Sequence, residues 1–187
     1  MLATPAATPS FTHEVRQVTR VDVRLSWHRG CPVGPANLRL IRLGYWGFDG
    51  KPHVGAVVVN FAVVDEVSKV FEQLYNAHFP IRRMQPIEAY GGSGRRSADA
   101  DNTSAFDCRR SGRAAGRGID INPVENPRVV RGVATPFAGR KYLNRAKVRL
   151  GMAVSGGLLV QAFAQVGWSW AGRVVPRDYA HFSANGR

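Results

Sequence analysis

Two stretches of the chain carry hydrophobic residues at the spacing of amphipathic helices. In the first, apolar residues recur every three or four positions: Val63, Val64, Val67, Val70, Phe71 and Leu74. This period matches one face of an α-helix, and Asn60 just before it is a residue type that caps helix N-termini. Residues 157–166 repeat the pattern with leucine, alanine, phenylalanine and valine. The sequence therefore predicts one helix between Asn60 and Phe79-Pro80 and a second over 157–166.

Short runs of β-branched and aromatic residues predict strands. The run VGAVVV at 54–59 is the clearest of them, and the segments 168–170 and 179–182 read as strands that close the fold. Residues 81–90 are also expected to form a strand, although Pro86 restricts it to a sheet edge or a bulge. Together with the two helices, these strands predict a mixed α+β architecture.

Residues 119–122 alternate between isoleucine and a polar residue. In a strand this alternation points both isoleucines into the core and turns Asp120 and Asn122 towards a cleft. The segments 26–55, 91–118 and 123–150 are rich in glycine, proline or polar residues, and they are expected to be loops.

The pattern as a whole predicts one small domain. A chain of 187 residues, 44% of them hydrophobic, is long enough for a single core. Residues 1–25 are expected to be a flexible lead-in, because Pro5 and Pro9 oppose regular structure, and residues 26–187 are expected to form the domain. The segment 1–10 has neither the basic nor the apolar region of a signal peptide but resembles a sequence that follows a cleavage site. No segment approaches the roughly 20 apolar residues of a membrane span.

The net charge is +13 and comes from 22 Arg and 4 Lys against 13 acidic residues. Such an excess favours binding to polyanions, including nucleic acid, anionic lipid and anionic wall polymers. A coding bias towards arginine that decorates the surface explains it equally well, since the arginines are scattered along the chain. Cys31 and Cys108 are the only cysteines, and composition alone is compatible with a disulfide or with two reduced thiols.

A few residues have the chemistry of a catalytic or metal site. Asp178 precedes His181 by three positions at the start of a predicted strand, so the two can place a base and a ligand around one water molecule. Asp120 lies between two isoleucines, where an unpaired carboxylate is costly, so a metal or an arginine partner is expected. The arginine-rich segment 94–113 could contact nucleic acid, although it lacks aromatic residues for base stacking, or it could hold an oxyanion or a substrate carboxylate.

Several long segments, taken in order, resemble the zinc D-alanyl-D-alanine carboxypeptidases, a family related to the vancomycin-resistance peptidases and to phage L-alanyl-D-glutamate endolysins. They are SWHRGCPVGPANLR (26–39), YWGFDG (45–50), FPIRRMQPIEAYGG (79–92), ADNTSAFDCR (100–109), GRGIDINPVENP (116–127), GWSWAG (167–172) and PRDYAHFSA (176–184). The resemblance covers nearly everything from residue 26 onward. It implies a hedgehog-like or DD-peptidase-like antiparallel sheet with flanking helices.

The resemblance also implies roles for individual residues. Asp120 and His181 correspond to two zinc ligands, and Asp178 corresponds to the general base. Arg96, which is followed by a serine, corresponds to the arginine that stabilises the tetrahedral intermediate. Asn102 and Ser104 fall in the stretch that lines the substrate cleft. Because this is a family of the cell envelope, and because one cysteine lies in each of two matching segments, Cys31 and Cys108 are expected to be bridged.

One position departs from the family pattern. The first zinc-binding histidine should lie seven residues before Asp120, and that position is Arg113. A guanidinium is permanently charged and offers only donors, so it cannot bind zinc. Two protein ligands are fewer than the three that a catalytic zinc normally has, so either His28 or His53 supplies the third, or the metal is weak, or the site is inactive. Arg113 is expected to pair with Asp120 and keep it ionised.

The leading hypothesis is therefore a secreted or envelope zinc peptidase that cuts D-amino-acid-containing peptidoglycan peptides, either active or degenerate. Its expected cofactor is one weakly bound zinc ion or none, and its expected partners are peptidoglycan stem peptides and anionic wall polymers. We expect a monomer and no nucleic-acid partner. The alternative is a non-catalytic protein that binds peptidoglycan or wall polymers on the same scaffold.

Overall fold

The computed structural model describes residues 10–109, 113 and 115–184 as one α+β domain. Its strands form three small antiparallel sheets, in the orders β1-β2-β3, β4-β9-β7 and β6-β5-β8. The predicted α+β class is confirmed, while the hedgehog-like arrangement stays a prediction. Among the described residues, no helix has the length and apolar character needed to span a membrane.

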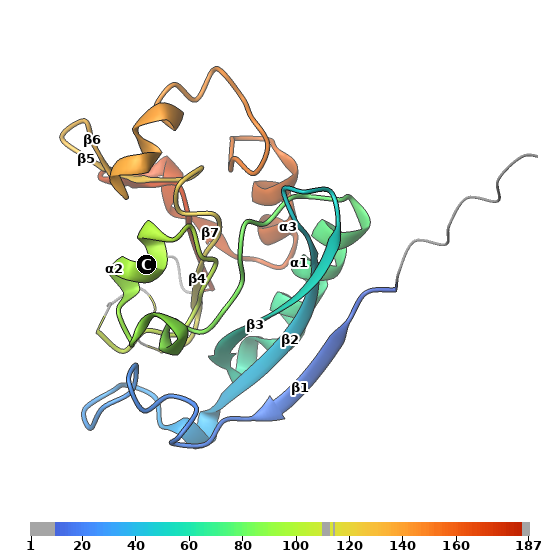
Figure 1. Ribbon diagram of the computed structural model, residues 1–187, viewed down its shortest axis with the longest axis vertical. Coiled ribbons are helices and arrows are strands. Elements are labelled where there is room, and N and C mark those ends of the chain that lie inside the picture. Colours follow the sequence, from blue (N-terminus) through green and yellow to red (C-terminus); the bar gives the residue numbers. More distant parts are fainter. Residues whose placement is uncertain (1–9, 110–112, 114, 185–187) are drawn as a thin grey trace, which may run out of the picture.

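The first sheet carries the main core. It consists of β1 (His13–Gln17), β2 (Leu38–Trp46) and β3 (Pro52–Asn60). Ile41 and Leu43 of β2, with alternate valines of β3, are buried against the helical side, whereas Leu38 and Val58 face a second, smaller cluster. Figure 1 shows this long sheet with α1 and α3 behind it.

The two predicted helices are confirmed. Helix α1 (Val64–Asn76) follows the 3-10 turn η2 (Phe61–Val63), and its buried residues are Val67, Val70, Phe71, Leu74 and Tyr75. Asn60 caps η2, because its side chain accepts a hydrogen bond from the amide of Ala62. Helix α3 (Leu158–Gln165) packs beside α1, with Leu159 and Phe163 in the same core.

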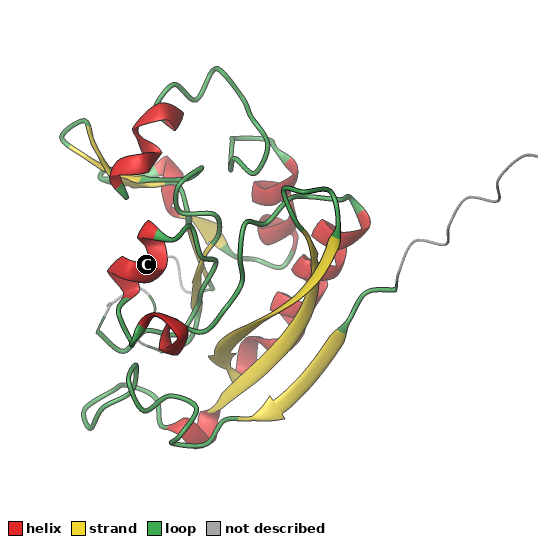
Figure 2. Cartoon of the chain, in the orientation of Figure 1, coloured by secondary structure: helices red, strands yellow, loops and turns green. Residues whose placement is uncertain are grey.

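The remaining elements are short, and several of them position the candidate site. The strands are β4 (Gly118–Asp120), β5 (Arg128–Val130), β6 (Val133–Thr135), β7 (Ser169–Trp170), β8 (Arg177–Asp178) and β9 (His181–Ser183). The helical elements are α2 (Gly94–Asp99) and the 3-10 turns η1 (Pro35–Asn37), η3 (Ile87–Tyr90), η4 (Phe137–Tyr142) and η5 (Ala171–Arg173). Loops make up much of this part of the chain (Figure 2).

Several predictions of secondary structure were wrong. Strand β1 lies inside the predicted flexible lead-in, because its backbone pairs with β2 over five residues; residues 1–9 lie outside the described part. Strand β2 lies inside the predicted loop 26–55. Residues 81–90 do not form the predicted strand. Met84 makes a single isolated β-bridge with Thr103, and the chain enters η3 directly after Pro86. The predicted loops 91–118 and 123–150 contain α2 and the pair β5–β6, respectively.

Candidate functional site

The pairing of β4 with β9 places two predicted site residues opposite one another. Asp120 and His181 are partners in the antiparallel register, although 61 residues separate them in sequence. Asp120 Oδ1 lies 2.8 Å from His181 Nδ1, and both residues are largely buried. The neighbouring Ile119 and Phe182 are fully buried and anchor both strands in the core. The ladder therefore fixes the carboxylate against the imidazole.

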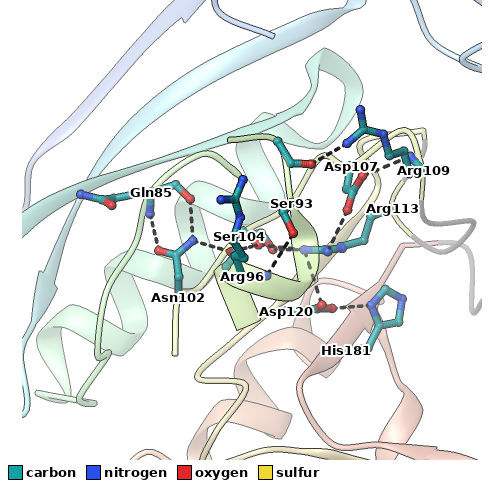
Figure 3. Close-up of polar contacts among 12 residues, drawn as sticks. Gln85, Ser93, Arg96, Asn102, Ser104, Asp107, Arg109, Arg113, Asp120 and His181 are labelled. Atoms are coloured by element: carbon teal, nitrogen blue, oxygen red, sulfur yellow. Dashed lines mark hydrogen bonds and ion pairs between the residues drawn. The ribbon is translucent and has the colours of Figure 1, made fainter. Parts of the chain in front are cut away.

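Arg113 completes this group from the side of Asp120 (Figure 3). Its side chain is only 3% exposed, and its Nη1 lies 3.4 Å from Asp120 Oδ2. The same nitrogen donates to Ser104 Oγ at 2.8 Å, and Nη2 lies 3.5 Å from Asp107 Oδ2. The ion pair between Arg113 and Asp120 that the sequence predicted is therefore present, and Asp107 is a second carboxylate that the sequence analysis missed.

The position of Arg113 depends on a turn that is docked onto the first sheet. Gly116 has a φ of +68°, a left-handed conformation that favours glycine, and its amide donates to Arg113 O at 2.9 Å. Its carbonyl accepts from the Asn60 amide at 2.8 Å, and Asn60 Nδ2 donates to Ala115 O at 3.1 Å. A side chain at Gly116 would place its Cβ 2.7 Å from Asn60 N. The end of β3 thus holds the turn that carries the arginine.

Ser104 contributes through the backbone as well as its hydroxyl. It forms an isolated antiparallel bridge with Asp120, with Ser104 N donating to Asp120 O at 3.1 Å and Asp120 N donating to Ser104 O at 2.9 Å. Its carbonyl also accepts from Arg113 Nη1 at 3.2 Å. Ser104 therefore ties the arginine to β4, and a contact between Ser104 and substrate stays a prediction.

Asn102 is wholly buried and bonded to its surroundings. Its Nδ2 donates to Gln85 O at 2.8 Å and to Ser97 Oγ at 2.9 Å, while its Oδ1 accepts from Gln85 N at 2.9 Å. Figure 3 shows these bonds on the opposite side of Ser104 from Asp120. Asn102 thus holds together the segments at Gln85 and at Ser97 in α2. Because its side chain is wholly buried in this structure, it has no exposed group that could contact a substrate directly.

Arg96 stands on α2 with its side chain exposed. The amide of Arg96 donates to Ser93 Oγ, the N-cap of the helix, at 3.2 Å. Its guanidinium lies over Gly91, where any side chain would collide with it. Asp178 is half-buried on β8, which pairs with β5, and so belongs to a different sheet from His181 on β9. The roles of Arg96 as oxyanion group and of Asp178 as base stay predictions.

The residues around Asp120 do not fit a zinc ion. A catalytic zinc takes three protein ligands, each turned towards the metal. Here the two candidate ligands are bonded to each other, and a guanidinium occupies the third side. Arg113 Nη1 lies 3.4 Å from Asp120 Oδ2. A cation bound to Asp120 would therefore lie close to the guanidinium, and the two positive charges would repel each other in a site with little solvent.

The other histidines that the sequence suggested as a third ligand lie elsewhere. His53 Nε2 is 3.0 Å from Asp49 Oδ1 at the turn between β2 and β3. His28 Nε2 is 3.3 Å from Cys108 Sγ. Both imidazoles therefore have partners away from the Asp120–His181 pair.

Cys31 and Cys108 form a disulfide with a Cα–Cα distance of 5.6 Å, which confirms the predicted bridge. His28 beside it gives a group of one histidine and two cysteines with closely spaced donor atoms. Metal binding by cysteine requires thiolates, and sulfurs joined in a disulfide do not supply them. The disulfide therefore links the loop between β1 and η1, which contains Cys31, covalently to the segment that carries Asp107.

A second cluster of charged residues joins Arg82 to the buried carboxylates of Asp101 and Glu125, and the sequence analysis missed it. Arg82 Nε is 3.3 Å from Asp101 Oδ2, and its Nη2 is 3.3 Å from Glu125 Oε1. Tyr142 donates to the same Glu125 oxygen at 3.1 Å. The pKa of Asp101 is raised to about 7, first by burial and then by the hydrogen bond and the charge of Glu125, against the lowering effects of the Val124 amide and of Arg82.

This raised pKa predicts a loss of stability as the pH rises towards neutrality. An acid whose pKa is higher in the folded state than in the unfolded state stabilises the fold at low pH, and that contribution disappears as pH rises from about 4 to about 7. We expect the free energy of unfolding to fall by on the order of a few kcal/mol between pH 5 and pH 8. Urea denaturation at both values measures it.

Asp101→Asn is the control for this pH dependence, because it keeps the shape of the side chain and removes its titration. The variant should lose most of the difference in stability between pH 5 and pH 8. An equal pH dependence in the variant would assign the effect to another group.

One comparison with known proteins found a match, and it covers the segment that carries most of the candidate site. Residues 107–184 match the family model described as D-alanyl-D-alanine carboxypeptidase, a segment that includes Arg113, Asp120, Asp178 and His181. The part of the chain that holds the site is therefore peptidase-like. The match confirms the resemblance to the D-alanyl-D-alanine carboxypeptidase family that the sequence showed. No curated protein and no solved structure matches the chain.

Proposed function

We propose that this protein recognises D-amino-acid-containing peptides of peptidoglycan and does not hydrolyse them by zinc chemistry. The observation that carries the proposal is the guanidinium of Arg113, which lies 3.4 Å from Asp120 in the place expected for a metal ligand. A permanent cation there supplies the positive charge that the carboxylate needs. The fold can then persist without an ion.

Recognition of the peptide is expected to use the parts of the site that remain exposed. Arg96 on α2 presents a guanidinium to solvent, and a guanidinium binds a carboxylate with two parallel hydrogen bonds. The terminal carboxylate of a D-alanyl-D-alanine peptide is such a group. The family match supports a peptide of this type as the ligand.

The second candidate is a zinc-dependent carboxypeptidase, and one observation favours it. Asp120 and His181 are paired across β4 and β9, so two of the three expected ligands already lie together. If Arg113 withdrew from Asp120, these two residues would be available to a metal. The environment we propose for either activity is the cell envelope, and the disulfide between Cys31 and Cys108 supports it.

Zinc content separates the two candidates. Wild-type protein purified without chelator should contain far less than one equivalent of zinc per chain, as measured by mass spectrometry of the metal. Arg113→His should raise zinc affinity by about a hundredfold or more, since loss of even an outer-shell partner costs 10–100-fold. Arg113→Gln is the matched control, because it removes the charge without supplying an imidazole, and it should gain much less.

Peptide binding and hydrolysis complete the test. Calorimetry should show binding of a diacetylated L-lysyl-D-alanyl-D-alanine peptide in preference to its all-L isomer, and Arg96→Ala should weaken it by about tenfold. Wild-type protein should release no D-alanine from the peptide. One equivalent of zinc in the wild type together with release of D-alanine would establish the carboxypeptidase instead. Equal binding of both isomers would contradict recognition of D-centres.

A further inference from the structure

One continuous segment of the chain concentrates positive charge. Residues 128–150, here called the basic lobe, contain seven lysine and arginine residues and no acidic residue. Six of the seven are exposed: Arg128, Arg131, Arg140, Lys141, Lys147 and Arg149. The lobe consists of β5, β6, η4 and the loop that follows, and Figure 1 shows these elements at the edge of the molecule away from β1–β3. More than half of the net charge of +13 therefore lies in 23 residues.

The same lobe exposes large apolar side chains. They are Val130, Val133, Phe137, Leu143, Val148 and Leu150, and the most exposed are Leu150 at 70%, Phe137 at 69% and Val133 at 64%. These six are among fourteen exposed large hydrophobic residues in the described chain, so the lobe holds more than its share. Val174 and Val175 are also exposed, and they precede β8, the strand that pairs with β5. Apolar side chains gathered on an exposed surface indicate a binding surface.

Cationic and apolar groups are interleaved within the lobe. The guanidinium carbon of Arg140 lies 4.3 Å from the ring centre of Phe137, and both side chains are exposed. Arg149 and Lys141 lie 5.0 Å and 5.3 Å from the ring centre of Tyr142. Cations therefore lie next to aromatic rings in this lobe, and a ligand at Arg140 and Phe137 meets both a positive charge and hydrocarbon.

We propose that the basic lobe binds the surface of an anionic phospholipid bilayer. Acidic headgroups attract lysine and arginine near the surface by about 1 kcal/mol each, and apolar side chains gain free energy by entering the boundary of the hydrocarbon region. A polyanion such as nucleic acid or a wall polymer would use the charges but would leave Val133, Val148 and Leu150 in water. The combination therefore favours a membrane over a polymer.

The position of the lobe relates this surface to the candidate site. Strand β5 pairs with β8, with Arg128 opposite Asp178. A bilayer bound at the lobe would lie on the sheet that carries Asp178, three residues from His181. The protein would then work on peptides close to the membrane surface, and this consequence is independent of whether it cuts them.

The test uses the full chain and sedimentation with vesicles. Vesicles of phosphatidylcholine with 30% phosphatidylglycerol should bind the protein at low salt, whereas vesicles of phosphatidylcholine alone should not. Reversing three charges with Lys141→Glu, Lys147→Glu and Arg149→Glu should reduce binding by about a hundredfold. The control reverses three exposed charges outside the lobe, Arg24→Glu, Arg29→Glu and Lys51→Glu, and should retain most of the binding.

A second variant distinguishes a membrane from a polyanion. Val148→Ser with Leu150→Ser removes two exposed apolar side chains and should reduce vesicle binding by about tenfold. Val15→Ser with Val21→Ser, exposed outside the lobe, should have little effect. If the serine variant binds as well as the wild type while the charge reversal abolishes binding, the ligand is a polyanion and the membrane proposal is wrong. Equal binding by the lobe and control charge variants would also overturn it.

Discussion

Replacing Arg113 with alanine should lower the free energy of unfolding by about 3–5 kcal/mol, the range measured when one partner of a buried ion pair is removed. The guanidinium lies 3.5 Å from Asp107 and 3.4 Å from Asp120, and both carboxylates are largely buried. Without Arg113, two negative charges would face each other in a site with little solvent. Urea denaturation at pH 7 measures the change.

Two further variants separate the loss of charge from the loss of contacts at Arg113. Arg113→Ala combined with Asp107→Asn and Asp120→Asn removes the unpaired charges, so it should recover part of the lost stability. Arg95→Ala is the surface control, because its side chain is 87% exposed and its pair with Asp99 is long, and it should change stability by less than about 1 kcal/mol. A similarly small effect for Arg113→Ala would show that the guanidinium is solvated and not buried.

Loss of the disulfide should cost about 4 kcal/mol of stability. The bond joins residues 77 positions apart, so it restricts the unfolded chain strongly, and the chain-entropy relation gives this magnitude for such a loop. Cys108 also follows Asp107 directly, and its amide donates to Ser26 O at 3.2 Å. Reduction should therefore loosen the carboxylate that holds Arg113 as well as destabilise the fold.

Denaturation with and without a dithiol reductant measures the contribution of the disulfide. The double variant Cys31→Ser and Cys108→Ser should resemble the reduced wild type and should not respond to the reductant. Two titratable thiols in the unreduced, denatured protein would contradict the bridge altogether.

The sequence predicted the elements whose pattern reflects burial on a single face. Helix α1 has one apolar face against the first sheet, so the spacing of Val67, Val70 and Leu74 was sufficient to locate it. Strand β2 was missed because arginine and glycine residues interrupt its apolar residues, and the glycine and proline residues before it suggest a loop. Strand β3 is buried on both sides like β2, but its unbroken run of three valines was sufficient to locate it.

The candidate site was predictable only where its residues lie in recognisable segments. Asp120 and His181 were found through the segments that resemble the carboxypeptidase family, and the departure at position 113 followed from a fixed spacing. Asp107 carried no such signal, because its contact with Arg113 depends on how the loop before β4 folds. The pair of Asp101 and Glu125 was hidden for the same reason, since its members meet only through tertiary structure.

The late position of β9 in the chain sets the order in which the site can assemble, because β9 carries His181 and pairs with β4. Arg113, Asp107 and Asp120 lie within fourteen residues of sequence and are synthesised together, but His181 belongs to the last of the described strands. A chain that emerges from the ribosome or from a membrane channel would therefore hold an open ion pair until the segment after Trp170 docks. Until then the edge of β4 facing β9 is unpaired, and an unpaired strand edge is where association with another chain begins. Late docking of β9 thus exposes the same strand to misassembly that it later protects.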